Sequence, residues 1–217
     1  MPDKKNNSKT EISIIDYQMG NLHSVCKGIE RSGGIPKIIT SAAEIKKAKI
    51  IVLPGVGSFD PAMKQLKKQD LISPLNEAIA EKKPFLGICL GLHLLFEGSE
   101  EGVENGLALL PGSVKKIKNE PEITIPHMGW NQLKLTNPNC YLWKGLTKNP
   151  WVYFVHSYFA QPTNYVVESA AVTHGTQQVT AAIQFENIAA VQFHPEKSAA
   201  IGLHMLKNFV QQDQTHK

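Results

Sequence analysis

Three short runs of mainly apolar residues, each leading into a turn and then a helical pattern, dominate the first part of the chain. They occupy residues 12–15, 50–53 and 84–88. Runs of this kind are typical of strands that are buried on both faces. When such strands alternate with helices, they form a parallel sheet through right-handed crossover connections. The sequence therefore predicts an α/β fold with an open, mostly parallel sheet flanked by helices.

The remaining pattern completes this sheet and extends it. Apolar residues recur at helical spacing at Leu22, Val25, Cys26 and Ile29, and a short strand is expected near 37–39. Further helical patterns lie at 42–47, within 61–81, at 90–97 and at 200–211. After residue 107, strands joined by Pro, Gly and Asn turns are expected at 151–158, 166–172 and 180–184. We expect these strands to form an antiparallel extension of the sheet.

The composition is that of an ordinary globular protein, with 42% apolar and 19% charged residues among 217. We expect a single domain at 12–213, preceded at 1–11 by a polar, disordered tail without the apolar core of a secretory signal. The net charge of +4 is small and the lysines are scattered, so no nucleic-acid partner is expected. No apolar run is long enough to cross a bilayer, so no membrane association is expected either.

The cysteines indicate the redox environment. Three widely separated residues, Cys26, Cys89 and Cys140, argue against a disulfide framework. Unpaired thiols favour a reducing compartment, and we expect the cytoplasm. Because His, Cys, Asp and Glu residues show no metal-ligand spacing, we predict no metal site and no other cofactor.

The segment Gly87-Ile88-Cys89-Leu90-Gly91 carries the strongest chemical signal, because it lies where a buried strand turns into a helix. Such a nucleophile elbow holds its central residue in a strained conformation above the sheet edge, and small flanking residues allow the tight fold. A helix that begins at Leu90 would favour the thiolate form of Cys89. The alternative is a buried structural cysteine, which Cys26 and Cys140 fit better than Cys89 does.

A thiolate nucleophile needs a partner that accepts and donates protons, and His194 is the best candidate. It ends the apolar run 188–193 and opens His194-Pro195-Glu196. An extended backbone before proline would place His194 and Glu196 on one face, so that Glu196 could fix the imidazole tautomer. The tripeptide alone is a weak signal. By default the other histidines are satisfied surface or core residues, namely His23, His127, His156, His174, His204 and His216.

An oxyanion intermediate needs backbone N–H donors near the nucleophile. The segment Gly55-Val56-Gly57 follows the strand at 50–53 and should reach the same sheet edge as Cys89. We therefore predict one oxyanion donor within this segment and a second at Leu90. Without Cys89, the same segment would be interpreted as a simple tight turn.

Together these motifs resemble the class-I, triad-type glutamine amidotransferases, which have a flavodoxin-like α/β fold. Additional blocks are similar to the glutaminase subunits of imidazole glycerol phosphate synthases. These blocks span 16–21, 54–59, 126–131, 153–158 and 193–198. The resemblance covers residues 12–211, and glutaminases that serve other synthases lack several of the blocks.

The resemblance implies a mechanism and a set of substrate contacts. Cys89 would attack the side-chain carboxamide of glutamine, His194 would protonate the departing ammonia, and water would hydrolyse the thioester to give glutamate. The amide of Val56 would have to rotate inward to complete the oxyanion hole. Glutamine-binding residues implied by the family pattern are Gly55, Gly57, His93, Ser157 and Tyr158.

The resemblance also implies a partner. Ammonia would pass to a (β/α)₈ barrel cyclase subunit that forms imidazole glycerol phosphate in histidine biosynthesis. Interface residues implied in the same way are Asn21, Met128, Trp130, Tyr153 and Lys197. Aromatic residues are common interface anchors, although a buried core tryptophan is the competing interpretation of Trp130.

One position departs from the family pattern. His93 stands where the family usually has glutamine, a side chain that helps to bind the substrate. Because Cys89, His194 and Glu196 are all present, we expect altered glutamine affinity rather than lost activity.

Three other functions compete with this prediction. A paralogous glutaminase could supply ammonia for amidine formation on surface sugars. A non-catalytic binding or regulatory module could use the same fold with Cys89 as a redox-sensitive thiol. A cysteine peptidase on a similar sheet would leave the glutamine-pocket and interface blocks unexplained.

Overall fold

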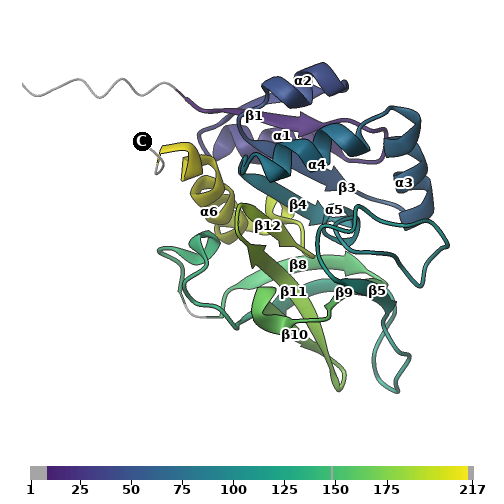
Figure 1. Ribbon diagram of the computed structural model, residues 1–217. Helices are drawn as coiled ribbons and strands as arrows, with labels where there is room; N and C mark the ends of the chain where they lie inside the picture. The colour runs from purple at the N-terminus through teal and green to yellow at the C-terminus, as the bar shows by residue number, and fades with distance from the viewer. Residues whose placement is uncertain (1–8, 148, 215–217) are drawn as a thin grey trace, which may run out of the picture.

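The computed structural model describes residues 9–147 and 149–214, so most of the predicted tail lies outside the described residues (Figure 1). Within them the main sheet has eight strands in the order β2-β1-β3-β4-β12-β11-β10-β7. Parallel pairing joins β2 (Ile35–Ile39), β1 (Glu11–Ile15), β3 (Ile51–Gly55), β4 (Phe85–Cys89) and β12 (Ile188–Val191). Antiparallel pairing adds β11 (Gln177–Phe185), β10 (Glu168–His174) and β7 (Lys134–Leu135). The predicted α/β fold, a mostly parallel sheet with an antiparallel extension, is confirmed.

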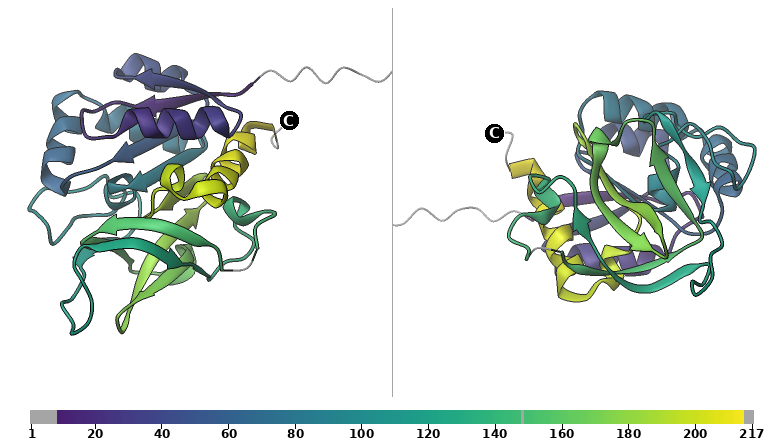
Figure 2. Two further views of the ribbon diagram at one scale, coloured as in Figure 1. Left: turned by 180° about the vertical axis from the view of Figure 1, so that it is seen from behind. Right: turned by 90° about the horizontal axis from the view of Figure 1, so that it is seen from below.

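Helices cover both faces of the parallel strands. Helices α1 (Leu22–Arg31) and α6 (Ala199–Val210) lie over one face, and α2 (Ala42–Lys47), α3 (Phe59–Lys68) and α4 (Ile72–Ala80) lie over the other (Figures 1 and 2). Side chains alternate between the two cores: Ile51 and Leu53 pack with α3 and α4, whereas Val52 packs with α1 and α6. Every residue of β3 and β4 is buried, which explains why these strands are apolar throughout.

Two antiparallel ribbons lie beside the main sheet. One pairs β5 (Gly112–Lys116) with β9 (Tyr158–Pro162), and the other pairs β6 (His127–Gln132) with β8 (Trp151–His156). The single strand expected at 151–158 is therefore wrong, because the chain leaves one ribbon and enters the other at Ser157. The Ser157 carbonyl accepts a hydrogen bond from the Ile117 amide at 2.9 Å instead of continuing the pairing with β6.

The helix after Cys89 is shorter than expected. The sequence predicts a helix over 90–97, but α5 spans only Leu90–His93. The carbonyl groups of Leu94, Leu95 and Phe96 accept hydrogen bonds from the amides of residues 107–110, at 2.8 to 3.2 Å, instead of from the next helical turn. The returning chain thus ends the helix, and a single turn contributes only a small dipole beside Cys89.

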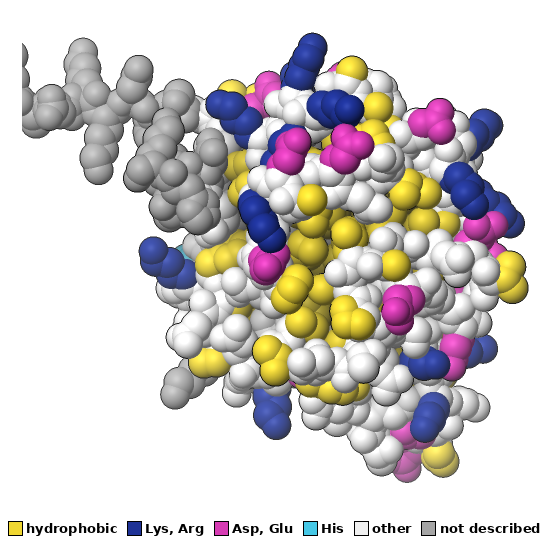
Figure 3. All heavy atoms as spheres, viewed as in Figure 1, with side chains coloured by type: hydrophobic (Ala, Val, Ile, Leu, Met, Phe, Trp, Pro, Cys, Tyr) yellow, Lys and Arg dark blue, Asp and Glu magenta, His cyan; other side chains and the backbone are white. Residues whose placement is uncertain are grey.

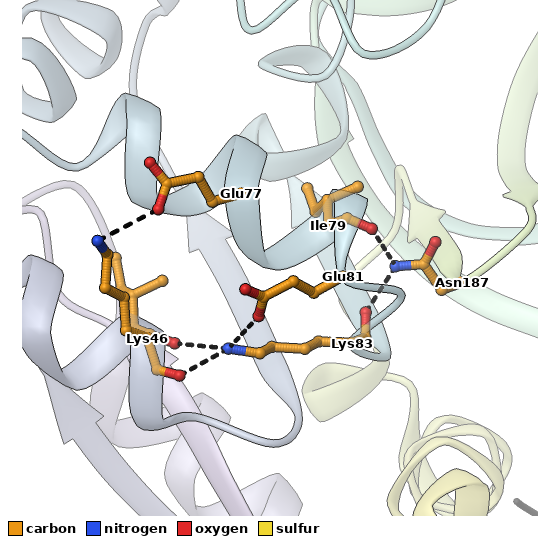
Figure 4. Close-up of polar contacts among 7 residues, drawn as sticks. Lys46, Glu77, Ile79, Glu81, Lys83 and Asn187 are labelled. Carbon is orange, nitrogen blue, oxygen red and sulfur yellow. Dashed lines mark hydrogen bonds and ion pairs between the residues drawn. The ribbon is translucent and has the colours of Figure 1, made fainter.

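A polar network ties α2, α4 and β4 together at the end of the sheet that lies opposite Cys89 (Figure 4). The ammonium group of Lys83 donates to the Lys46 carbonyl at 2.7 Å, at the C-terminal end of α2. The side-chain amide of Asn187 donates to the carbonyls of Ile79 at 3.1 Å and Lys83 at 2.7 Å. Asn187, in the β11–β12 turn, therefore fixes the end of α4 next to the start of β4.

Charges of both signs are interspersed over the face seen in Figure 3, in keeping with the small net charge of +4. None of the helices in the described residues is both long and apolar enough to cross a membrane.

Replacing Asn187 with Ala should destabilise the protein, because the Lys83 carbonyl would lose the Asn187 donor and the Ile79 carbonyl would keep only its hydrogen bond from the Lys82 amide. We expect the free energy of unfolding to fall by about 2 kcal/mol. Urea denaturation followed by circular dichroism measures the change. Asn119→Ala is the matched control, because Asn119 is exposed and should give a change within about 0.5 kcal/mol. Equal stability of the two variants would contradict the role assigned to Asn187.

Candidate active site

Cys89 is held in a strained turn at the end of β4. Its backbone has φ 54° and ψ −108°, a conformation that L-residues rarely adopt, and its side chain is buried. A Cβ atom on Gly91 would lie 1.9 Å from the carbonyl oxygen of Leu53, and one on Gly87 would lie 2.8 Å from that of Gly91. Both flanking glycines are therefore required by close backbone packing, as the elbow motif predicts.

His194 and Glu196 follow β12, the strand that pairs with β4. The Nδ1–H group of His194 donates to Glu196 Oε1 at 2.8 Å, and both side chains are almost completely buried. The extended backbone expected before Pro195 is confirmed at His194, but Pro195–Lys197 forms a 3₁₀ turn in which Glu196 curls back to His194. This turn packs on α1, where a Cβ on Gly28 would lie only 3.0 Å from Glu196 Cβ.

The ionisation of His194 reflects opposing effects. Burial alone would lower the pKa of His194, but its interactions with Cys89 and Glu196 raise that pKa to about 9. Nε2 of His194 has no hydrogen-bond partner among the described residues. This nitrogen is therefore available to exchange a proton with a bound substrate.

The two predicted oxyanion donors, the amides of Val56 and Leu90, differ in their surroundings. Gly55 pairs with Cys89 in the sheet, which brings the end of β3 beside the elbow. The amide of Val56 donates to the Met19 carbonyl at 2.8 Å, so it is already engaged. Leu90 begins α5 directly after Cys89.

A pocket of about 410 Å³ opens next to the elbow. Its lining includes the predicted residues Val56, Gly57, Cys89, Leu90, His93, Ser157, Tyr158 and His194. Gly55 and Glu196 are not part of the lining: Gly55 pairs with Cys89 in the sheet, and Glu196 contacts His194. A larger hollow of about 900 Å³ between β5, β9 and β11 contains neither cysteine nor histidine, so the smaller pocket is the candidate active site.

Sequence reasoning missed two residues at this site, one in the pocket lining and one behind it. Glu101 lines it and accepts a hydrogen bond from the Phe59 amide at 2.8 Å, at the start of α3. Gln192 is completely buried behind the pocket lining, where its side-chain amide donates to the Cys89 sulfur at 3.8 Å. The only signal for Gln192 in the sequence is a polar residue in an otherwise apolar run.

A chain of hydrogen bonds connects β6 to the pocket. The Nδ1–H group of His156 donates to the Tyr158 carbonyl at 2.8 Å, which leaves its Nε2 to accept from His127 Nδ1–H at 3.0 Å. Nε2 of His127 then accepts from the Asn131 amide at 3.2 Å. Burial lowers the pKa values of both histidines, to about 4 for His127, so each is neutral and its tautomer is fixed. These hydrogen bonds order the backbone around Tyr158.

The predicted interface residues lie on the surface. One face of the β6–β8 ribbon, here called the aromatic face, carries Met128, Trp130, Trp151, Tyr153 and Val155. Trp130 is 50% exposed and contacts Tyr153 edge to face, with 6.1 Å between ring centroids, so a buried core tryptophan is excluded. Val155 also lines the pocket, which places the aromatic face beside the pocket mouth. Asn21 and Lys197 are exposed as well.

The described residues contain no cluster of three or more His, Cys, Asp or Glu side chains that could hold a metal ion.

Comparison with known proteins gives consistent matches. The family model described as "Glutamine amidotransferase class-I" matches residues 13–212. The chain is 82% identical to the imidazole glycerol phosphate synthase subunit hisH of Cyanophora paradoxa, covering 98% of this chain and 99% of that protein. It is 58% identical to the HisH subunit of Trichormus variabilis, covering 93% and 95% of the two chains.

Solved structures share the fold at low sequence identity. PurLQS from Thermotoga maritima has a TM-score of 0.72 at 18% identity, over 94% of this chain and 96% of that one. The glutaminase domain of CTPS from Trypanosoma brucei has a TM-score of 0.66 at 15% identity, over 94% of both chains.

The raised pKa of His194 predicts a pH dependence of stability. The folded-state pKa of about 9 exceeds the ordinary value of 6.5, so protonated His194 stabilises the folded protein. This contribution to the free energy of unfolding is complete below pH 6.5 and is lost as the pH rises through 9. The stability difference between wild type and His194→Gln should therefore be largest near pH 6.5 and should shrink towards pH 9. Urea denaturation of both proteins under reducing conditions measures it, and a difference that grows with pH would refute the assignment.

Proposed function

We propose a function from the premise that this chain belongs to the class-I glutamine amidotransferase family and, within it, to the HisH subunits of imidazole glycerol phosphate synthase. The chain is the glutaminase of such a synthase, hydrolysing glutamine at Cys89 and passing the ammonia to a cyclase subunit. The observation that carries this function is the buried Cys89, His194 and Glu196 constellation at the edge of a 410 Å³ pocket.

The reaction begins with the sulfur of Cys89. The thiolate attacks the side-chain carbonyl carbon of glutamine, and negative charge moves to the carbonyl oxygen. His194 donates a proton to the nitrogen as the C–N bond breaks, which releases ammonia and leaves a γ-glutamyl thioester. Water then attacks the thioester while His194 accepts its proton, the C–S bond breaks, and glutamate leaves. Glu196 keeps Nε2 of His194 directed at these reacting atoms.

The oxyanion needs donors that the resting site only partly supplies. The Leu90 amide lies next to the sulfur, but the Val56 amide is bonded to Met19 and has to rotate towards the pocket. We infer that the resting chain is therefore weakly active. Binding of the partner and its ligand would favour the rotated state, so that glutamine is hydrolysed only when ammonia can be used.

The pocket supports recognition of a free amino acid. The carboxylate of Glu101 lines the pocket and can accept hydrogen bonds from an α-ammonium group. Gly57, Ser157 and Tyr158 lie around the same space and would contact the rest of the substrate. With its α-ammonium group held at Glu101, glutamine would then extend across the pocket and place its side-chain carboxamide at Cys89.

The partner is proposed to be a (β/α)₈ barrel cyclase that docks on the aromatic face, with Asn21 and Lys197 contributing nearby. Exposed Met128 and Trp130 give this face the composition of an interface core. High identity to proteins named HisH favours this partner over an amidine-forming synthase. Such an enzyme is expected in the cytoplasm, where its nucleotide substrate is available.

The function is tested by glutamate release from glutamine, measured for the chain alone and with the cyclase and its nucleotide ligand. Strong stimulation by the partner is expected for wild type, and Cys89→Ala should lower the stimulated rate by at least about 10³-fold. Cys26→Ala is the matched control, because Cys26 lies on α1 outside the pocket. Stimulated hydrolysis that survives in Cys89→Ala would refute the proposed nucleophile, and no hydrolysis by wild type would refute the function.

Trp130→Ala should weaken binding of the cyclase, because it removes a large exposed anchor at the centre of the aromatic face. The dissociation constant from titration calorimetry should rise by about 10-fold or more. Val166→Ala serves as control, because Val166 is 81% exposed on a different part of the molecule. Unchanged affinity for Trp130→Ala would mean that the cyclase binds elsewhere.

A further inference from the structure

We propose that Gln192 is a further catalytic residue, whose side-chain amide donates a hydrogen bond to the sulfur of Cys89, and that His93 is the positioning residue that orients this amide. The proposal rests on the proposed function, since it assigns these residues to the same thioester chemistry. It also gives a role to the histidine that departs from the family pattern.

Gln192 connects the two residues directly. Its Oε1 lies 2.6 Å from His93 Nε2, and its Nε2 lies 3.8 Å from Cys89 Sγ. The side chain is completely buried, and the backbone amide is fixed to the Ala181 carbonyl at 2.8 Å. A buried amide must have partners at both ends, and these two contacts supply them.

The donor and acceptor roles follow from the chemistry of the groups. A carbonyl oxygen can only accept, so His93 Nε2 donates its proton to Gln192 Oε1. This bond turns the NH₂ group of Gln192 towards Cys89. Hydrogen bonds to a charged acceptor are stronger than those to a neutral one, so the NH₂ group favours the thiolate over the thiol.

The two histidines around Cys89 act in different ways. Burial lowers the pKa of His93 to about 4, so His93 is neutral at pH 7 and contributes through its hydrogen bond rather than through a charge. His194, by contrast, carries the proton that the reaction uses. His93 also lines the pocket, but the nitrogen that contacts Gln192 is not free to bind glutamine.

The bridge, by which we mean the hydrogen bonds from His93 to Gln192 and from Gln192 to Cys89, acts at two points of the reaction. It orients the sulfur and stabilises its negative charge before attack on the carboxamide. When water cleaves the thioester, negative charge returns to the sulfur as the C–S bond breaks, and the same N–H group stabilises it again. Loss of the bridge should therefore lower kcat and leave glutamine binding nearly intact.

The test uses the complex with the cyclase and its nucleotide ligand and compares wild type with Gln192→Leu, His93→Leu, His93→Gln and the double Leu variant. Two quantities are measured: steady-state constants for glutamine, and the rate at which iodoacetamide alkylates Cys89 at pH 7, followed by peptide mass spectrometry. Gln192→Leu should lower both kcat and the alkylation rate by about 10-fold, with KM within about threefold. His93→Leu should lower them less, and His93→Gln, which still offers an N–H group, should restore part of that loss.

The double variant gives the sharpest outcome. If His93 acts through Gln192, the double Leu variant should be no slower than Gln192→Leu alone, whereas independent effects would multiply. Unchanged alkylation in a folded Gln192→Leu, or a change confined to KM, would overturn the proposal. If Gln192→Leu does not fold, equal alkylation rates in His93→Leu and wild type would overturn it instead. Alkylation needs no glutamine, so inactivity of wild type towards glutamine would refute the proposed function without affecting this test.

Discussion

The parallel pairing of β3, β4 and β12 is the constraint on which the candidate site depends. In this register Gly55 lies beside Cys89, and Ile88 lies beside Val191. The proposed oxyanion segment, the proposed nucleophile and the segment that carries the proposed base therefore leave the sheet at one edge, although they are far apart in the chain. Helix α5 can pack against the end of β3 only because Gly91 has no side chain to meet the Leu53 carbonyl. One backbone contact thus fixes both the elbow and its neighbours.

The sequence predicted what local patterns determine. Consecutive residues show that the strands are buried on both faces, where the elbow glycines lie and that α1 is amphipathic. The fold class and the helix at 42–47 could be predicted from patterns of this kind. Predictions failed where a distant segment competes for a backbone group. The helix after Cys89 ends at His93 because residues 107–110 return to bond the carbonyls of residues 94–96, and the strand at 151–158 divides because Ser157 bonds Ile117. Local propensity contains no information about either partner.

Side-chain contacts within the site were harder to predict than its nucleophile. Gln192 touches Cys89 only because β12 and β4 are neighbours, and Glu101 reaches the pocket from a loop that packs against the start of α3. The chain of His127 and His156 depends on the pairing of β6 with β8, which places two histidines directly opposite each other. Each contact joins segments that are distant in the chain, and local sequence patterns do not specify how such segments pair or pack.

The two halves of the catalytic machinery are held with different strengths. The backbone of Tyr153, on the aromatic face, accepts from the His194 amide at 3.0 Å and donates to Ser198 Oγ at 3.0 Å, so β8 fixes both sides of the His-Pro-Glu segment. The Val56 amide, by contrast, is held outward by one hydrogen bond to Met19, whose net value is about 1 kcal/mol. A partner therefore needs only a small difference in binding free energy between the two states to turn Val56 inward, whereas moving His194 would disrupt several bonds at once. By this argument the proposed oxyanion segment, and not the proposed triad, is the part of the site that a partner would switch.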